Sequence, residues 1–244
     1  MGPDAGAAGA AKPPAAGAAT GGAKGAAKGA AKSSNARPAA RAAVVDRLKP
    51  LLFAFALIPF ARLFVLGFQD GLGANPIEFV TRSTGFWTLT FLCITLAITP
   101  LRRLTGWQML IRLRRMLGLF AFFYACTHLL TYVWFDQWFS LEEIVKDVWK
   151  RPFITVGFAA FLLLVPLAIT STNRMVRKLG RRWSQLHRLV YLVVILGVTH
   201  FWWLKQDKND LAQPWLFSAI VLALLLFRIL YPIWQRRAVR STRR

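Results

Sequence analysis

Residues 116–135, MLGLFAFFYACTHLLTYVWF, form an apolar run that holds one histidine and no charged side chain. A helix needs about 20 apolar residues to cross the hydrocarbon core of a bilayer, which is about 30 Å thick. This run therefore predicts a membrane-spanning helix. Five further apolar runs at regular spacing have the same character: 51–68, 86–101, 153–169, 189–204 and 215–234. Because the runs show little amphipathic striping, we expect an all-α membrane protein, a six-transmembrane-helix bundle, and not the core helices of a soluble protein.

Composition and the distribution of charge agree with this fold class. The chain carries 32 Lys and Arg against 10 Asp and Glu, a net charge of +22, while 56% of its residues are hydrophobic. A basic nucleic-acid-binding protein has a mostly polar surface and fewer hydrophobic residues, so that class of protein explains the charge poorly. The bases instead gather in alternate loops. The stretches rich in Arg and Lys that contain no acid are 100–115, 171–182 and 236–244.

The remaining loops give the orientation. Residues 70–85, 136–152 and 205–214 are close to neutral or acidic. Basic loops stay in the cytoplasm, so the pattern predicts a multi-pass protein of the bacterial inner membrane with both termini cytoplasmic.

Three segments are expected along the chain. Residues 1–47 are rich in Ala, Gly and Lys, and their glycines each cost a helix about 1 kcal/mol relative to Ala, so we expect a disordered cytoplasmic tail. Residues 48–235 form the transmembrane domain, and 236–244 a basic cytoplasmic C-terminus. The chain's two cysteines lie inside apolar runs and predict neither a disulfide framework nor a zinc site.

All three histidines, His128, His187 and His200, lie in or beside the third and fifth runs. An ionisable side chain at membrane depth is costly and marks a candidate functional site. Neutral imidazole is a common axial ligand of haem iron, and helix bundles hold cofactors between facing side chains. The alternative is that each histidine only forms hydrogen bonds between helices.

The spacing of the histidines suggests two levels in the membrane. His128 and His200 both fall in the outer half of their spans, where they can face one another. His187 precedes His200 by 13 residues, which is about 20 Å at 1.5 Å per residue, so it lies at the cytoplasmic end. Two such levels suit two stacked haems. A 13-residue offset does not return to the same helix face, however, so a tilt, a bulge or a ligand reaching around the helix is needed.

Two arginines are further candidates. Arg114 lies 14 residues before His128 on nearly the same helix face, where an inner ligand is expected. A guanidinium stays protonated and is a poor iron ligand, but it can pair with a haem propionate. Arg62 lies in the first span just after Pro59 and either contacts a propionate or a quinone oxygen, or pairs with a carbonyl or extends to the interface. Arg228, near the inner end of the sixth span, is expected to extend to the interface.

Several segments resemble a known family. They are GANPIEFVTRSTGFWTL at 73–89, ITPLRRL at 98–104, RLRRMLGL at 112–119, HLLTYVWFD at 128–136 and WSQLHRLVY at 183–191. Together with paired histidines on the third and fifth spans, they are similar to the MsrQ (YedZ) family within the ferric reductase and NADPH oxidase transmembrane superfamily. The resemblance covers roughly residues 48–234, and the tail lies outside it.

This resemblance implies a haem-binding membrane subunit of the periplasmic protein-methionine-sulfoxide reductase system. It implies b-type haem, one or two per chain, held between the third and fifth helices, and FMN. It further implies a quinone or quinol electron source and a periplasmic molybdopterin partner, MsrP. By position, His128 and His200 are implied as ligands of the outer haem, and His187 as the ligand of an inner site where Arg114 replaces a fourth histidine.

Other functions stay open at this point. The sequence has no glycine-rich dinucleotide or phosphate loop, so electrons are expected from a separate donor, either quinol or a cytosolic flavin reductase. A stand-alone ferric or cupric reductase is the nearest alternative. A proton-coupled transporter is less consistent with the sequence, because the runs hold no Asp or Glu at depth. A passive membrane anchor needs no histidines at matched depths.

Overall fold

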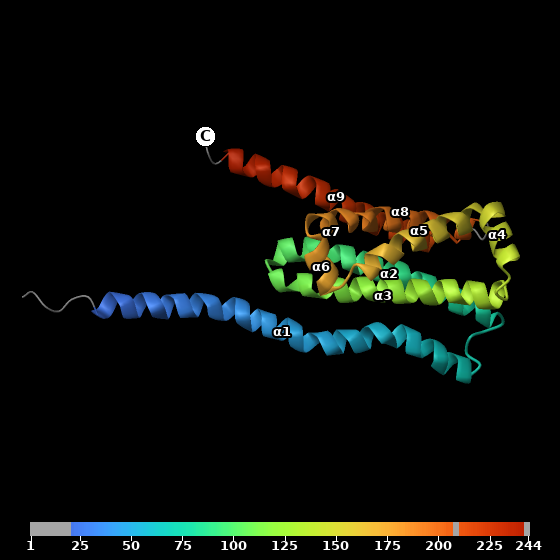
Figure 1. Ribbon diagram of the computed structural model, residues 1–244, viewed down its shortest axis with the longest axis horizontal. Coiled ribbons are helices and arrows are strands. Elements are labelled where there is room, and N and C mark those ends of the chain that lie inside the picture. The colour runs from blue at the N-terminus through green and yellow to red at the C-terminus, as the bar shows by residue number, and fades with distance from the viewer. Residues whose placement is uncertain (1–20, 207–209, 242–244) are drawn as a thin grey trace, which may run out of the picture. The chain divides into compact units, whose positions relative to one another are not determined.

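The computed structural model describes residues 21–206 and 210–241, with side chains from Val44 to Arg236 apart from 45 and 207–209. The described part is helical and contains no strand (Figure 1). In chain order it comprises α1 (Gly21–Phe68), α2 (Pro76–Thr105), η1 (Gln108–Leu110), α3 (Ile111–Thr131), the π-helix η2 (Tyr132–Asp136), α4 (Leu141–Lys150), α5 (Pro152–Ile169), α6 (Asn173–Leu179), α7 (Arg181–Leu186), α8 (Leu189–Gln206) and α9 (Ala212–Ser241).

Six helical segments of this part are long and apolar enough to cross a membrane, which confirms the predicted fold class. The spans are Asp46–Phe68, Pro76–Thr105, Gln108–Asp136, Pro152–Ile169, Arg181–Gln206 and Ala212–Arg236. The fifth span is not one helix, because α7 ends at Leu186 and α8 begins at Leu189. His187 lies in this interruption, which supplies the local irregularity that the 13-residue offset requires.

The N-terminal region differs from its prediction. The chain divides into the units Met1–Ala43 and Val44–Arg244. Helix α1 begins at Gly21, so residues 21–47 are helical where a disordered tail was expected. Alanine has the highest helix propensity, and a segment that continues an existing helix avoids the cost of nucleation. Residues 1–20 of the expected tail lie outside the described residues.

Two helix pairs form the centre of the larger unit. Helix α2 packs along α3, and α5 packs along α8 (Figure 1). In each pair the chain runs one way in the first helix and returns in the second. The most deeply buried apolar side chains come from α2, α3 and α8: Leu96, Ala121, Tyr124, Val193 and Val194. The first helix of each pair begins with a proline, Pro76 or Pro152, at a position where no helical N–H is lost.

The hydroxyl of Tyr124 forms hydrogen bonds with backbone groups of α1 next to Pro59. Pro59 has no N–H and its ring opens the helix locally. The buried hydroxyl of Tyr124, on α3, donates to the carbonyl oxygen of Ala56 at 2.8 Å and accepts from the N–H of Phe60 at 3.1 Å. A side chain inserted into the helical hydrogen-bond ladder in this way replaces the direct bond between the two backbone groups.

The side chain of Arg228 donates to a backbone carbonyl of α2 that a proline leaves without its helical partner. Pro100 lies inside this helix, so the carbonyl of Leu96 has no N–H four residues ahead of it. The guanidinium of Arg228, on α9, donates from Nη2 to this carbonyl at 3.0 Å and to the hydroxyl of Thr99 at 3.1 Å. It also bonds the hydroxyl of Tyr191. Arg228 therefore turns into the bundle, and the expectation that it extends to the interface is wrong.

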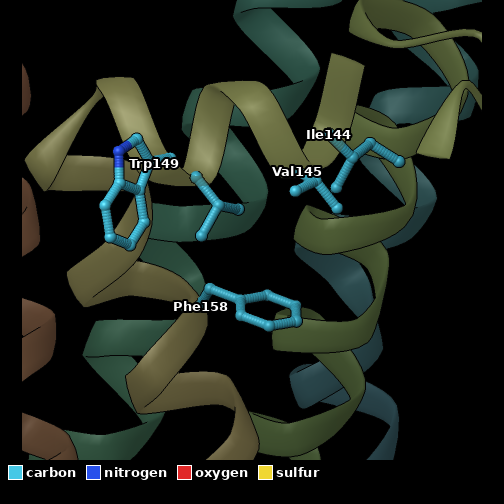
Figure 2. A pocket seen from close by; sticks show the side chains of 5 residues that line it. Ile144, Val145, Trp149 and Phe158 are labelled. Atoms are coloured by element: carbon cyan, nitrogen blue, oxygen red, sulfur yellow. The ribbon is translucent and has the colours of Figure 1, made fainter. Parts of the chain in front are cut away.

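Helix α4 lies across one end of the bundle (Figure 1). One of its faces is apolar, and three side chains of that face, Leu141, Val145 and Trp149, are 78%, 68% and 87% exposed. Figure 2 shows the groove between α4 and α5. It is lined by Ile144, Val145, Val148, Trp149 and Phe158. An amphipathic helix that joins two spans is suited to the membrane interface.

Candidate functional site

Two histidines meet at the end of the bundle that carries α4. His128 lies near the C-terminal end of α3, and His200 lies near the C-terminal end of α8. Their ring centroids are 6.1 Å apart and their planes are inclined at 77°. Both side chains are half-buried. The structure thus brings together the two histidines that the sequence places in the outer half of their spans.

Each imidazole is fixed by a backbone carbonyl of the neighbouring helix. Nδ1 of His128 lies 2.8 Å from the oxygen of Thr81, on α2, and Nδ1 of His200 lies 2.7 Å from the oxygen of Phe153, on α5. A carbonyl oxygen only accepts, so Nδ1 carries a proton in both rings. In a neutral imidazole of this tautomer Nε2 has a lone pair that can bind a metal ion.

This arrangement fits a pair of axial iron ligands. Metal-bound histidines usually donate their other ring N–H to a carbonyl or carboxylate, as both rings do here. A metal ion held by two imidazole nitrogens at about 2 Å each separates the ring centroids by about 6 Å, close to the 6.1 Å observed.

The donor set favours iron within a macrocycle over a bare ion. In the part of the chain that the structure describes, no cluster of three or more His, Cys, Asp or Glu could hold a metal ion. A haem supplies four nitrogen ligands of its own and requires from the protein only axial donors. A pair of neutral histidines meets that requirement.

His187 forms a separate site in the break between α7 and α8. Its Nδ1 lies 3.1 Å from the carbonyl oxygen of Trp183, and its Nε2 lies 3.4 Å from the hydroxyl of Ser171. Its ring stacks on the indole of Trp183 with 3.9 Å between centroids. Since the Ser171 hydroxyl donates to the carbonyl of Leu167, the Nε2 lone pair of His187 is not taken up by that proton.

The two predicted arginines are placed differently. Arg114 and His187, the two candidates of the inner level, lie in the same region of the structure. Arg62 is exposed on α1, and the hydrogen bonds of the described residues include none between it and a histidine. The structure therefore forms one histidine pair and a second cluster with a single histidine.

Sequence reasoning missed the groups that hold the ligands. The carbonyls of Thr81 and Phe153 belong to the backbone and leave no residue signature of their own. Once the partners are known, a regularity appears, because each histidine follows its carbonyl partner by 47 residues. The role of Arg228 was also missed, although Pro100 indicates that some donor must reach the carbonyl of Leu96.

Comparison with known proteins decides the family. Residues 84–198 match the family described as ferric reductase like transmembrane component. The chain is 62% identical over 192 residues to the protein-methionine-sulfoxide reductase haem-binding subunit MsrQ of Herminiimonas arsenicoxydans, covering 78% of this chain and 88% of the relative. The chain belongs to the MsrQ family. The MsrQ of Bordetella pertussis is 56% identical over 202 residues, covering 82% of this chain and 97% of the relative.

Membership of the MsrQ family confirms the resemblance drawn from the sequence segments. The MsrQ of Ralstonia nicotianae extends the comparison at 58% identity over 181 residues, with 74% of this chain and 83% of the relative covered. These relatives are named as haem-binding subunits of a protein-methionine-sulfoxide reductase. The matched family segment includes His128 and His187 and ends two residues before His200.

Proposed function

We propose that this chain is a membrane cytochrome that transfers electrons across the bilayer as the haem-binding subunit of a methionine sulfoxide reductase system. The observation that carries the proposal is the pair His128 and His200, with centroids 6.1 Å apart and both Nδ1 atoms bonded to carbonyls. The names of the MsrQ relatives support the same reading.

The residues of the site have defined tasks in this proposal. His128 and His200 hold a b-type haem between the third and fifth spans through Nε2, and the iron supplies one-electron redox chemistry when the group is bound. The carbonyls of Thr81 and Phe153 keep both rings in the tautomer that leaves Nε2 free. The surrounding apolar helices limit access of water, which helps to set the redox potential.

The direction of electron flow follows from the predicted topology. Basic loops on one side favour cytoplasmic termini in an inner-membrane protein, which puts the His128–His200 pair near the periplasm. Electrons then come from quinol or a cytosolic flavin reductase and leave to MsrP, a periplasmic molybdopterin enzyme that repairs oxidised methionines. FMN is included by family resemblance alone.

A second haem is proposed at the inner level. His187 offers Nε2 as its ligand, and Arg114 is positioned to pair with a propionate. Arg62 is a further candidate for a propionate or a quinone oxygen.

The test is spectroscopic. The full chain is purified in mild detergent after expression with ample haem, and oxidised and dithionite-reduced spectra are recorded with a pyridine haemochrome assay. We expect a b-type spectrum that His128→Ala and His200→Ala each remove from the outer site. His187→Ala is compared with them, because it lies outside the pair: it is expected to leave the outer haem in place and to remove only the signal of the proposed inner haem. A wild-type protein without haem overturns the proposal.

The match to the ferric reductase like family supports one alternative, a stand-alone ferric or cupric reductase. The reduced, haem-loaded protein is mixed with either ferric citrate or MsrP, and reoxidation of the haem is followed. Fast reoxidation by MsrP alone supports the methionine sulfoxide reductase assignment, whereas fast reoxidation by ferric citrate alone supports the alternative.

A further inference from the structure

Two glycines lie directly against the two histidine rings. An ideal Cβ built on Gly157, in α5, lies 2.7 Å from Nδ1, 2.9 Å from Cε1 and 3.2 Å from Cγ of His200. A Cβ on Gly85, in α2, lies 3.1 Å from Cε1, 3.2 Å from Nδ1 and 3.6 Å from Nε2 of His128. In both cases the three nearest heavy atoms all belong to the imidazole. The space beside each glycine is therefore filled by a histidine ring and not by the backbone of a neighbouring helix.

The two glycines occupy the same place in the helical register. Gly85 follows Thr81 by four residues, and Gly157 follows Phe153 by four residues. In an α-helix a carbonyl points toward the residue four positions ahead, so the side chain there stands beside the oxygen. Glycine at this position leaves the oxygen open to a donor from another helix. The carbonyl and the glycine therefore act as one unit that receives an imidazole.

The unit occurs twice with equal spacing. Each histidine follows its carbonyl partner by 47 residues. The local sequences also agree: Ser83-Thr84-Gly85-Phe86 in α2 corresponds to Thr155-Val156-Gly157-Phe158 in α5. The histidines come from α3 and α8, the second helices of the two pairs. Two helix pairs thus present their imidazoles from matched positions.

We propose that Gly85 and Gly157 are paired positioning residues for the histidine ligands, which hold each ring against its carbonyl and set the inclination between the two planes. This inference rests on the proposed function, since it assumes that the rings bind iron. A Cβ at Gly157 forces the imidazole of His200 to move, and one at Gly85 requires the imidazole of His128 to give by a few tenths of an ångström. A ring displaced in this way has a weaker hydrogen bond to its carbonyl and a different plane, so the axial ligand field of a bound iron changes.

Two glycines in α3 and α8, the helices that carry the histidines, supply controls. A Cβ on Gly118, in α3, meets only Cγ2 of Thr95, at 3.8 Å, and one on Gly197, in α8, meets only Cδ1 of Leu89, at 3.5 Å. These are ordinary van der Waals contacts. Alanine is also the better helix former, so Gly118→Ala and Gly197→Ala change the partner helices of the same two pairs without crowding a histidine.

The test compares four full-length variants in detergent: Gly85→Ala, Gly157→Ala, Gly118→Ala and Gly197→Ala. Haem affinity is measured by titrating hemin into apoprotein, and the ligand field is measured by low-temperature EPR of the oxidised state. Wild type, with ring planes near perpendicular, is expected to give a highly anisotropic low-spin signal. Gly157→Ala is expected to lower haem affinity by roughly 10- to 100-fold, the usual range for lost support of a metal ligand, and to change the EPR signal.

Gly85→Ala is expected to have the smaller effect on affinity, because its ring contacts are longer, but it also changes the EPR signal. Both control variants keep the wild-type signal. Free imidazole is expected to restore a low-spin signal in Gly157→Ala, which a general packing defect does not permit. If Gly157→Ala fails to fold, Gly85→Ala decides alone. The inference is overturned if wild type binds haem and the variants at the histidine rings match the controls. A wild type without haem overturns the proposed function instead.

Discussion

The Tyr124 hydroxyl offers a clean test of how this bundle accommodates a proline. Tyr124→Phe removes one oxygen and keeps the ring, whose centroid lies 5.3 Å from that of Phe91 in a stacked arrangement. The two hydrogen bonds to the backbone of α1, at Ala56 and Phe60, are lost. The change therefore isolates the polar contribution of the contact between α1 and α3.

The expected loss in the free energy of unfolding lies between two limits. Hydrogen bonds between membrane helices average about 0.6 kcal/mol each, so two of them contribute about 1 kcal/mol. That lower limit applies if α1 straightens and its two backbone groups bond each other. If packing prevents this, the carbonyl of Ala56, a residue only 4% exposed, stays unpaired at a cost of about 1–3 kcal/mol. We expect a loss of about 2 kcal/mol in the free energy of unfolding.

The assay is reversible unfolding of the purified protein in mixed detergent and SDS micelles, followed by circular dichroism. Tyr231→Phe is the matched control, because the Tyr231 hydroxyl accepts only from the side chain of Gln235 on the same helix. We expect the control to unfold like wild type. An unchanged free energy in Tyr124→Phe, or an equal loss in both variants, would refute the argument that the hydroxyl bridges the ladder at Pro59.

Two further predictions concern α9 and α4. Arg228→Met leaves the carbonyl of Leu96 without a donor beside Pro100, so we expect about 1–3 kcal/mol less stability in the same SDS assay; a variant as stable as wild type would show that α2 closes this gap itself. On α4, nitroxide labels are placed at Trp149→Cys and at Glu143→Cys in a cysteine-free background. The label at 149, on the apolar face, should collide more with oxygen, which dissolves in lipid, than with a water-soluble nickel chelate. The label at 143, on the polar face, should show the reverse. Equal accessibility at both positions would argue against an interfacial helix.

The six spans were predictable because their signal is contained in composition. Each run is long and apolar, and the length of an apolar run is set by the thickness of the bilayer. The proximity of His128 and His200 was predictable from depth alone, since both lie near the C-terminal ends of the third and fifth spans, which run in the same direction. Their role as ligands stays a prediction.

The contacts that hold these groups were not predictable, because they depend on the register between helices. Nothing at Thr81 or Phe153 marks a carbonyl that receives an imidazole, and the partner appears only when two helices are placed side by side. Arg228 was misplaced for a related reason. An arginine near the end of a span usually extends to the interface, but here Pro100 leaves an unpaired carbonyl that a guanidinium can reach. The helix over 21–47 was not predicted, because the glycines of this segment disfavour a helix on their own, whereas here the segment continues into the long first span.

The equal spacing in the two helix pairs has a consequence for how the protein is made. Each pair carries one complete half of the histidine site, and the second histidine follows the first by 72 residues, from His128 to His200. The α2–α3 pair, with His128, is therefore synthesised before the α5–α8 pair, with His200. A group that bridges both halves binds only after the later hairpin has inserted, and it then stabilises the joined state over the separated one by mass action. Haem bound at the proposed site would accordingly add to the apolar packing that already joins the two hairpins.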